Sequence, residues 1–158
     1  MTAAIKFVSL PTETVRALQG GAPDANGQLP ERHISDGDGV PCRHCQQDVA
    51  AGDIYLILNY RPFPSAQPYA ETGPIFLHAD GCPRHPETGE LPPVIAVRKL
   101  FLIKGYNAAD RIVYGTGQLV TPAEMQDAAA RVLERDDVAY LHVRSAFNNC
   151  FQCRIERA

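Results

Sequence analysis

The chain has 158 residues, and its 15 Lys and Arg against 18 Asp and Glu give a net charge of −3. A chain of this length is one ordinary domain, residues 1–158, and buries about 70% of the surface that its unfolded form exposes. The acidic balance lacks the basic footprint of nucleic-acid-binding proteins, so no nucleic acid is expected as a partner. No apolar run reaches the roughly 20 residues of a membrane span, and the first ten residues do not form a signal peptide. We therefore expect a soluble, cytoplasmic protein without a membrane partner.

The N-terminal quarter is predicted to be mostly irregular. Ile5 and Phe7 alternate with polar neighbours as in a short strand, and residues 11–18 can form a brief helix before Gly20 and Gly21. Residues 20–41 are rich in Gly, Pro, Asp and Asn, which predicts a long surface loop.

The middle and the end of the chain carry the pattern of an antiparallel sheet. Runs rich in β-branched and aromatic residues predict strands over residues 54–60, 74–78 and 94–104. Residues 105–110 are typical of a hairpin connection to a strand over 111–114, and the strand pattern resumes up to Val120. Residues 138–144 and 150–156 then predict a C-terminal hairpin.

One main helix is predicted over about residues 122–135. Thr121 is a suitable N-cap, Pro122 suits the first helical position, and Glu124 completes a capping box. Apolar residues recur at helical spacing and form one stripe, which consists of Met125, Ala128, Ala129, Val132 and Leu133. The predicted fold class is α+β: a mainly antiparallel sheet, this helix packed on it, and the long N-terminal loop.

Four residues have the order and spacing of a metal site: Cys42, Cys45, His78 and Cys82. In a zinc knuckle a tight turn aims two thiolates, two residues apart, at one point, and a second pair completes the tetrahedron. Five cysteines are an odd number, and in a reducing compartment short spacings favour metal ligands over disulfides. We therefore expect zinc, with the four ligand atoms within about 4 Å of one another.

Two alternatives to this closed zinc site stay open. The cysteines could be small buried hydrophobic residues, with His78 a hydrogen-bonded histidine at a strand end. His44 and His85 are spare candidates that could replace a ligand, and an open three-ligand site would be catalytic rather than structural. The order of the motif is similar to that of the treble-clef fingers of poly(ADP-ribose) polymerase and some DNA ligases, but the acidic residues around it argue against DNA.

The second Cys-x-x-Cys pair, Cys150 and Cys153, lies in a predicted strand. Residues three apart in a strand point to opposite faces and lie about 10 Å apart, beyond the roughly 7 Å that a disulfide tolerates, so no redox pair is expected. Cys153 would face the core together with Phe151 and Ile155.

Symmetric pairing of the last two strands would place Arg144 opposite Cys150 and His142 opposite Gln152. A thiol beside an arginine can act as a nucleophile with His142 as a proton shuttle, so Cys150, His142 and Arg144 are the candidate catalytic residues. The alternative is a solvated sheet face with an inert thiol.

Segments along nearly the whole chain resemble the bacterial domain-of-unknown-function family 1203. They are residues 41–43, 52–56, 59–63, 68–78, 113–115 and 142–144, of which residues 68–76 are the most specific. The resemblance implies no assigned activity. It also implies another role for Cys42 and Arg43, as a functional thiol or an anchor in a pocket shared with His78 and Tyr69.

Two functional hypotheses follow. The first is a zinc-stabilised binding or regulatory module, with a pocket for a small molecule or protein between the sheet and the Pro-rich residues 61–73. The second is a cysteine-dependent enzyme that uses Cys42 or Cys150, with His78 or His142 as base and Arg43 or Arg144 as anion clamp. The sequence leaves the oligomeric state open.

Overall fold

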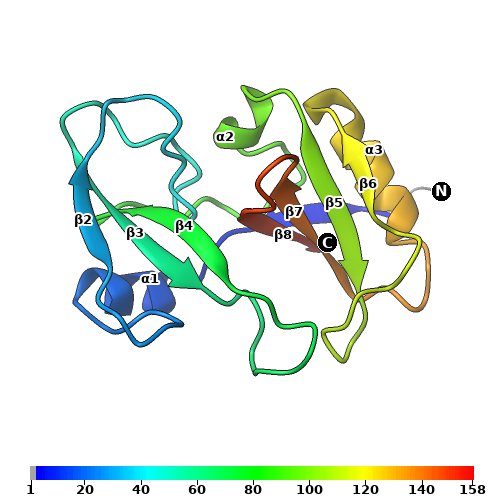
Figure 1. The fold of residues 1–158 in the computed structure, drawn as a ribbon. Helices are drawn as coiled ribbons and strands as arrows, with labels where there is room; N and C mark the ends of the chain where they lie inside the picture. The colour runs from blue at the N-terminus through cyan, green and yellow to red at the C-terminus, as the bar shows by residue number, and fades with distance from the viewer. Residues whose placement is uncertain (1–2) are drawn as a thin grey trace.

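Residues 3–158 are described by a computed structural model, in which they form two antiparallel sheets with short helices (Figure 1). The larger sheet has the strand order β1-β8-β7-β5-β6, and the smaller one has the order β2-β3-β4. The strands of the larger sheet are β1 (Ile5–Val8), β5 (Phe101–Tyr106), β6 (Gln118–Val120), β7 (Tyr140–Ser145) and β8 (Phe151–Arg157). Those of the smaller sheet are β2 (Glu31–Ile34), β3 (Ile54–Tyr60) and β4 (Gly73–His78). The predicted α+β class is confirmed.

The main helix packs on one face of the larger sheet. Helix α3 (Pro122–Val132) begins with the predicted capping box, and the backbone N–H of Thr121 donates to Glu124 Oε2 at 2.9 Å. The helix ends at Val132 rather than near residue 135, because Leu133 already forms the C-cap. The apolar stripe of α3 joins the inward side chains of β1, β5, β7 and β8 in the main core, among them Phe7, Phe101, Leu141, Val143 and Ile155.

The smaller sheet has a separate core, which it shares with α1 (Thr12–Gln19). Val15 and Leu18 of this helix pack with Leu56 and Leu77 of the sheet, and Cys42 belongs to the same cluster. Figure 1 shows α1 beside the small sheet, at the opposite end of the molecule from α3.

Three predictions about local structure were wrong. The predicted loop over residues 20–41 contains strand β2, a fully exposed edge strand that, within residues 3–158, pairs only with β3. The predicted strand over 94–104 begins only at Phe101, because residues 93–96 form a short helix, α2 (Pro93–Ala96), that starts at a Pro-Pro pair. Residues 111–114 form no strand of their own, and Ile112 makes a single bridge to Tyr106.

The register of the C-terminal hairpin also differs from the predicted one. His142 pairs with Arg154 and Val143 with Cys153, whereas Arg144 pairs with Phe151 across a β-bulge. Cys153 faces the main core as predicted. The bulge turns Phe151 to the other face, where its ring lies 4.8 Å from that of His142.

That second face of the larger sheet is covered by residues 61–72, a Pro-rich connection between β3 and β4 that we call the strap. Phe63 of the strap packs against Tyr106, with ring centroids 5.2 Å apart. Near its end, Glu71 accepts from Lys104 at 2.9 Å and from Asn149 at 3.1 Å. Through the strap, the smaller sheet is therefore attached to the larger one.

Candidate metal centre

The four predicted ligands come together beside the small sheet. Their ligand atoms all lie within 4.8 Å of one another. Cys42 Sγ lies 3.9 Å from Cys82 Sγ, and Cys45 Sγ lies 3.4 Å from His78 Nδ1. Tetrahedral zinc with bonds of about 2.0–2.3 Å needs ligand atoms about 3.5–3.8 Å apart. The group extends to 4.8 Å, beyond the expected limit of about 4 Å, so the side chains would have to draw together around an ion.

Local backbone structure explains how residues so far apart in sequence meet. The chain reverses at Cys42, whose N–H donates to Gln47 O at 3.0 Å and whose carbonyl accepts from Gln46 N at 3.0 Å. This turn lies beside β4, because Cys42 forms a parallel bridge with Phe76. His78 is the last residue of β4, and its N–H donates to Cys42 Sγ at 3.3 Å. Cys82 follows four residues later and completes the group.

The three thiols in the group share protons in a way that suits a metal. Hydrogen bonds from the thiols of Cys45 and Cys82 lower the pKa of Cys42, so its thiolate is the favoured one. The same hydrogen bonds raise the pKa of Cys45 and of Cys82. A divalent cation would displace the remaining thiol protons, which is the usual coupling of metal binding to thiol ionisation. Cys42 is fully buried, whereas Cys45, His78 and Cys82 line a cavity of about 460 Å³ through which an ion could enter.

The two spare histidines are not members of this group. His44 is buried behind Cys82, with Nδ1 3.1 Å from Cys82 Sγ and Nε2 2.8 Å from Thr12 Oγ1. His85 donates its backbone N–H to His44 O at 2.9 Å, and its Nε2 has no partner within residues 3–158. His44 therefore contacts the predicted ligand Cys82 from outside the group, an arrangement that spacing in the sequence could not indicate.

Arg43 bridges the turn over residues 42–47, which we call the cysteine turn, and the larger sheet. Its fully buried guanidinium donates to Pro41 O at 2.7 Å and to Phe151 O of β8 at 2.8 Å. Burial lowers its pKa to about 10, so it stays protonated at neutral pH. Both of its acceptors are backbone carbonyls, so Arg43 has a structural environment rather than that of an anion clamp.

The candidate catalytic residues of the last hairpin are not assembled into a hydrogen-bonded trio. Arg144 Nη2 donates to His142 Nδ1 at 2.9 Å, but the nearest polar partner of the Cys150 thiol is Asn148 O, at 3.8 Å. Cys150 and Arg144 line one small cavity of about 130 Å³, yet no hydrogen bond joins that thiol to either side chain in the described part of the chain. Cys150 and Cys153 are both free thiols.

Tyr69, which the family resemblance placed in a pocket with Cys42 and His78, lies elsewhere. Its hydroxyl contacts that of Tyr114 at 2.8 Å, and Arg111 lies over its ring. Tyr69 belongs to the strap, so the strap does not contribute this residue to the group of four predicted ligands.

Comparison with known proteins identifies the family. Residues 39–157 match the model of the family described as protein of unknown function (DUF1203). The chain belongs to this family. The DUF1203 match contains all four predicted ligand residues and ends at the last residue of β8, whereas β1, α1 and β2 lie outside it. No curated protein and no solved structure matches the chain. None of the helices within residues 3–158 has the length and apolar character of a membrane span.

Proposed function

We propose that this member of the DUF1203 family is a small binding or regulatory module stabilised by one zinc ion. The observation that carries the proposal is the convergence of Cys42, Cys45, His78 and Cys82. Three thiolates and one imidazole are soft and borderline ligands that suit zinc and not calcium or magnesium. Four protein ligands leave no open position, so the ion would be structural. It would join the cysteine turn, the end of β4 and the loop after it.

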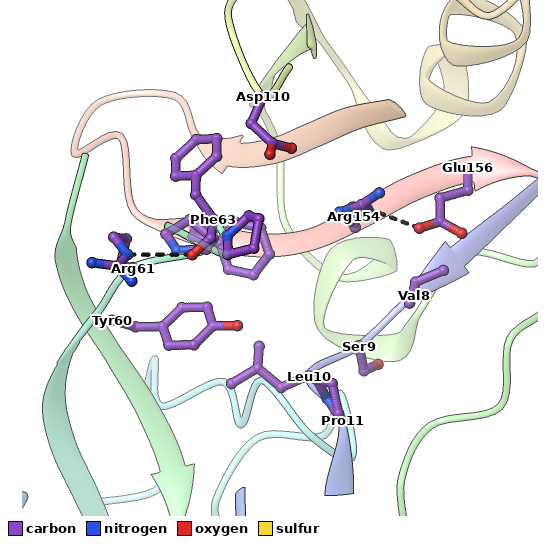
Figure 2. A pocket seen from close by; sticks show the side chains of 13 residues that line it. Val8, Ser9, Leu10, Pro11, Tyr60, Arg61, Phe63, Asp110, Arg154 and Glu156 are labelled. Carbon is purple, nitrogen blue, oxygen red and sulfur yellow. Dashed lines mark hydrogen bonds and ion pairs between the residues drawn. The ribbon is translucent and has the colours of Figure 1, made fainter. Parts of the chain in front are cut away.

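The binding part of the proposal rests on the cavity between the two sheets, which we call the inter-sheet cavity (Figure 2). Its volume is about 430 Å³, within the usual range for small-molecule pockets. Aromatic rings of Tyr60, Phe63 and Phe151 form an apolar wall. Figure 2 shows the Tyr60 hydroxyl pointing into the space between this wall and the segment that follows β1.

The charges around the inter-sheet cavity balance. Arg61 and Arg154 are matched by Asp110 and Glu156, and Arg154 pairs with Glu156 at 2.8 Å. An isolated anion or cation would meet a lining without net charge, in which Arg154 and Glu156 already satisfy each other. The cavity is therefore best suited to a small planar molecule without net charge, which can stack on the rings and hydrogen-bond with Tyr60.

Metal analysis of the purified protein tests the proposed zinc centre. We expect one zinc per chain by plasma mass spectrometry, and thiolate-to-cobalt charge-transfer bands after exchange with Co²⁺. Cys45→Ser and Cys82→Ser should lose the metal and lower the Tm by about 10 °C or more, since structural zinc contributes directly to folding free energy.

The matched control is Cys150→Ser, which removes a half-buried thiol outside the group. It should retain one zinc and nearly the wild-type Tm. A wild-type protein that binds neither Zn²⁺ nor Co²⁺ after full reduction would disprove the zinc proposal.

A further inference from the structure

Helix α1 directs three polar side chains at the surroundings of two proposed ligands: Arg16 and Gln19 contact the segment from His78 to Cys82, and Thr12 contacts His44, which in turn contacts Cys82. Thr12, Arg16 and Gln19 are spaced four and three residues apart and therefore share one side of the helix. Each of them contacts a ligand residue, its neighbour or its backbone carbonyl. The adjacent side of α1 carries the buried Val15 and Leu18.

Thr12 acts on Cys82 through His44. A metal-bound thiolate can only accept a hydrogen bond, so the 3.1 Å contact requires that His44 Nδ1 carry the proton and donate to Cys82 Sγ. His44 Nε2 must then accept from the Thr12 hydroxyl, 2.8 Å away. Pro11 is the N-cap of α1, and within residues 3–158 the hydrogen bond of the Thr12 hydroxyl is the one to His44.

Arg16 and Gln19 hold the backbone of the same segment. Arg16 Nη2 donates to Cys82 O at 2.9 Å, and Gln19 Nε2 donates to His78 O at 2.8 Å and to Asp80 O at 2.9 Å. Arg16 Nη1 donates to Gln19 Oε1 at 2.8 Å, which orients the amide so that its NH₂ faces those carbonyls. The two side chains thus fix both ends of the five-residue stretch from His78 to Cys82.

The same helix and the residues before it form walls of two cavities. Leu10 and Pro11 line the inter-sheet cavity. Ala17 and Leu18 line a neighbouring cavity of about 330 Å³, and Tyr60 lines both cavities. A change in the order of α1 would therefore change both walls.

We propose that α1 is the outer shell of the metal centre: it positions the His78 and Cys82 donors, and metal occupancy in turn controls the order of α1 and of the two cavity walls. This inference rests on the proposed zinc centre. Coupling between a metal and its outer contacts is reciprocal, so a helix that strengthens metal binding is itself stabilised when the metal binds. Ligand binding in the cavities would then depend on metal.

The test compares Thr12→Val, Thr12→Ser and the double variant Arg16→Ala/Gln19→Ala with the wild type. Thr12→Val keeps the shape but removes the hydroxyl, and should weaken Zn²⁺ affinity about 10- to 100-fold, as is usual for outer contacts of metal ligands. It should also shift the thiolate-to-cobalt charge-transfer band, because the Cys82 sulfur loses an oriented hydrogen bond. Thr12→Ser should restore both properties, and the double variant should weaken affinity to a similar extent.

Hydrogen exchange provides the second readout. In the wild type, removal of zinc by a chelator should raise amide exchange over residues 10–19 more than over α3. Glu13→Gln is the matched control, because Glu13 is an exposed residue in the same turn as Thr12. It should leave affinity, band position and exchange unchanged.

The outcomes separate this inference from the zinc proposal. If the wild type binds zinc but Thr12→Val and the double variant bind it equally tightly, and α1 exchanges equally with and without metal, the outer-shell role is wrong while the zinc centre stands. If the wild type binds no metal, both are wrong.

Discussion

His142 is the most unusual single residue outside the metal centre. Its fully buried ring lies among those of Phe63, Tyr106, Tyr140 and Phe151. Burial lowers its pKa well below 6.5, and the nearby charges of Arg144, Arg154 and Lys104 lower it further. Its Nε2 has no hydrogen-bond partner in the part of the chain that is described. His142 is therefore a neutral acceptor for Arg144, held inside an aromatic box.

This environment predicts a specific pH dependence. The unfolded chain binds a proton on His142 below pH 6.5, whereas the folded protein does not, so the folded state is increasingly disfavoured as the pH falls below 6.5. Between pH 7 and 5.5 this residue should cost about 1 kcal/mol of the free energy of unfolding. His142→Gln keeps an acceptor for Arg144 and should lose that dependence in urea titrations with saturating zinc. His33→Gln, at an exposed histidine, should keep it, and equal slopes for wild type and His142→Gln would contradict the prediction.

At the scale of elements, α3 begins at the predicted residue, Pro122, because its N-terminal cap is a local interaction. The carboxylate of Glu124 accepts from the backbone N–H of Thr121, which has no partner within the helix. Glu124→Ala should therefore lower the free energy of unfolding by about 0.5–1 kcal/mol, measured by urea titration. Glu124→Gln keeps an acceptor and should recover most of this loss. Glu134→Ala, just beyond the other end of the helix, should be neutral or slightly stabilising, since a negative charge there opposes the helix dipole.

At the scale of the whole molecule, polar contacts join the larger sheet to the segments that belong to the smaller one. Arg43 joins the cysteine turn to β8, and Glu71 of the strap is held by Lys104 and Arg144 of the larger sheet. Both connections involve buried or half-buried charges. A buried charge that loses its partner destabilises the folded state by several kcal/mol. These contacts hold the strap and β8, which supply Phe63 and Phe151 to the cavity lining, in a fixed arrangement.

The inter-sheet cavity predicts a selectivity that can be measured by a binding screen. Small planar uncharged molecules should bind better than mono-anions of the same size, because the lining has as many carboxylates as arginines and Arg154 is already paired with Glu156. For such a ligand, Tyr60→Phe should weaken binding by about tenfold, the value of one hydrogen bond. Tyr114→Phe, at an exposed tyrosine outside the cavity, should have no effect. Ligands that bind Tyr60→Phe as tightly as the wild type would place the binding site elsewhere.

Several features could be read from the sequence because they depend on neighbours along the chain. The capping box and the apolar stripe of α3, the strands at 54–60 and 138–144, and the spacing of the four ligands all reflect local geometry. A Cys-x-x-Cys turn aims its thiols at one point in any fold, so the convergence with His78 required only that β4 lie beside that turn. The edge strand β2 was missed because it is exposed on all its residues and has no alternating pattern.

What the sequence could not determine depends on contacts between distant segments. A single bulge changed the partners of Arg144 and turned Phe151 away from the main core, because strand register is set by packing and not by composition. His44 has the residue type and position of a ligand, yet the tertiary structure places it between Thr12 and Cys82. The sequence by itself determined which side chains could bind a metal. Only the folded chain decided which of them face one another, because the turn at Cys42 pairs with β4, and which helix stands behind them, because α1 packs on the small sheet.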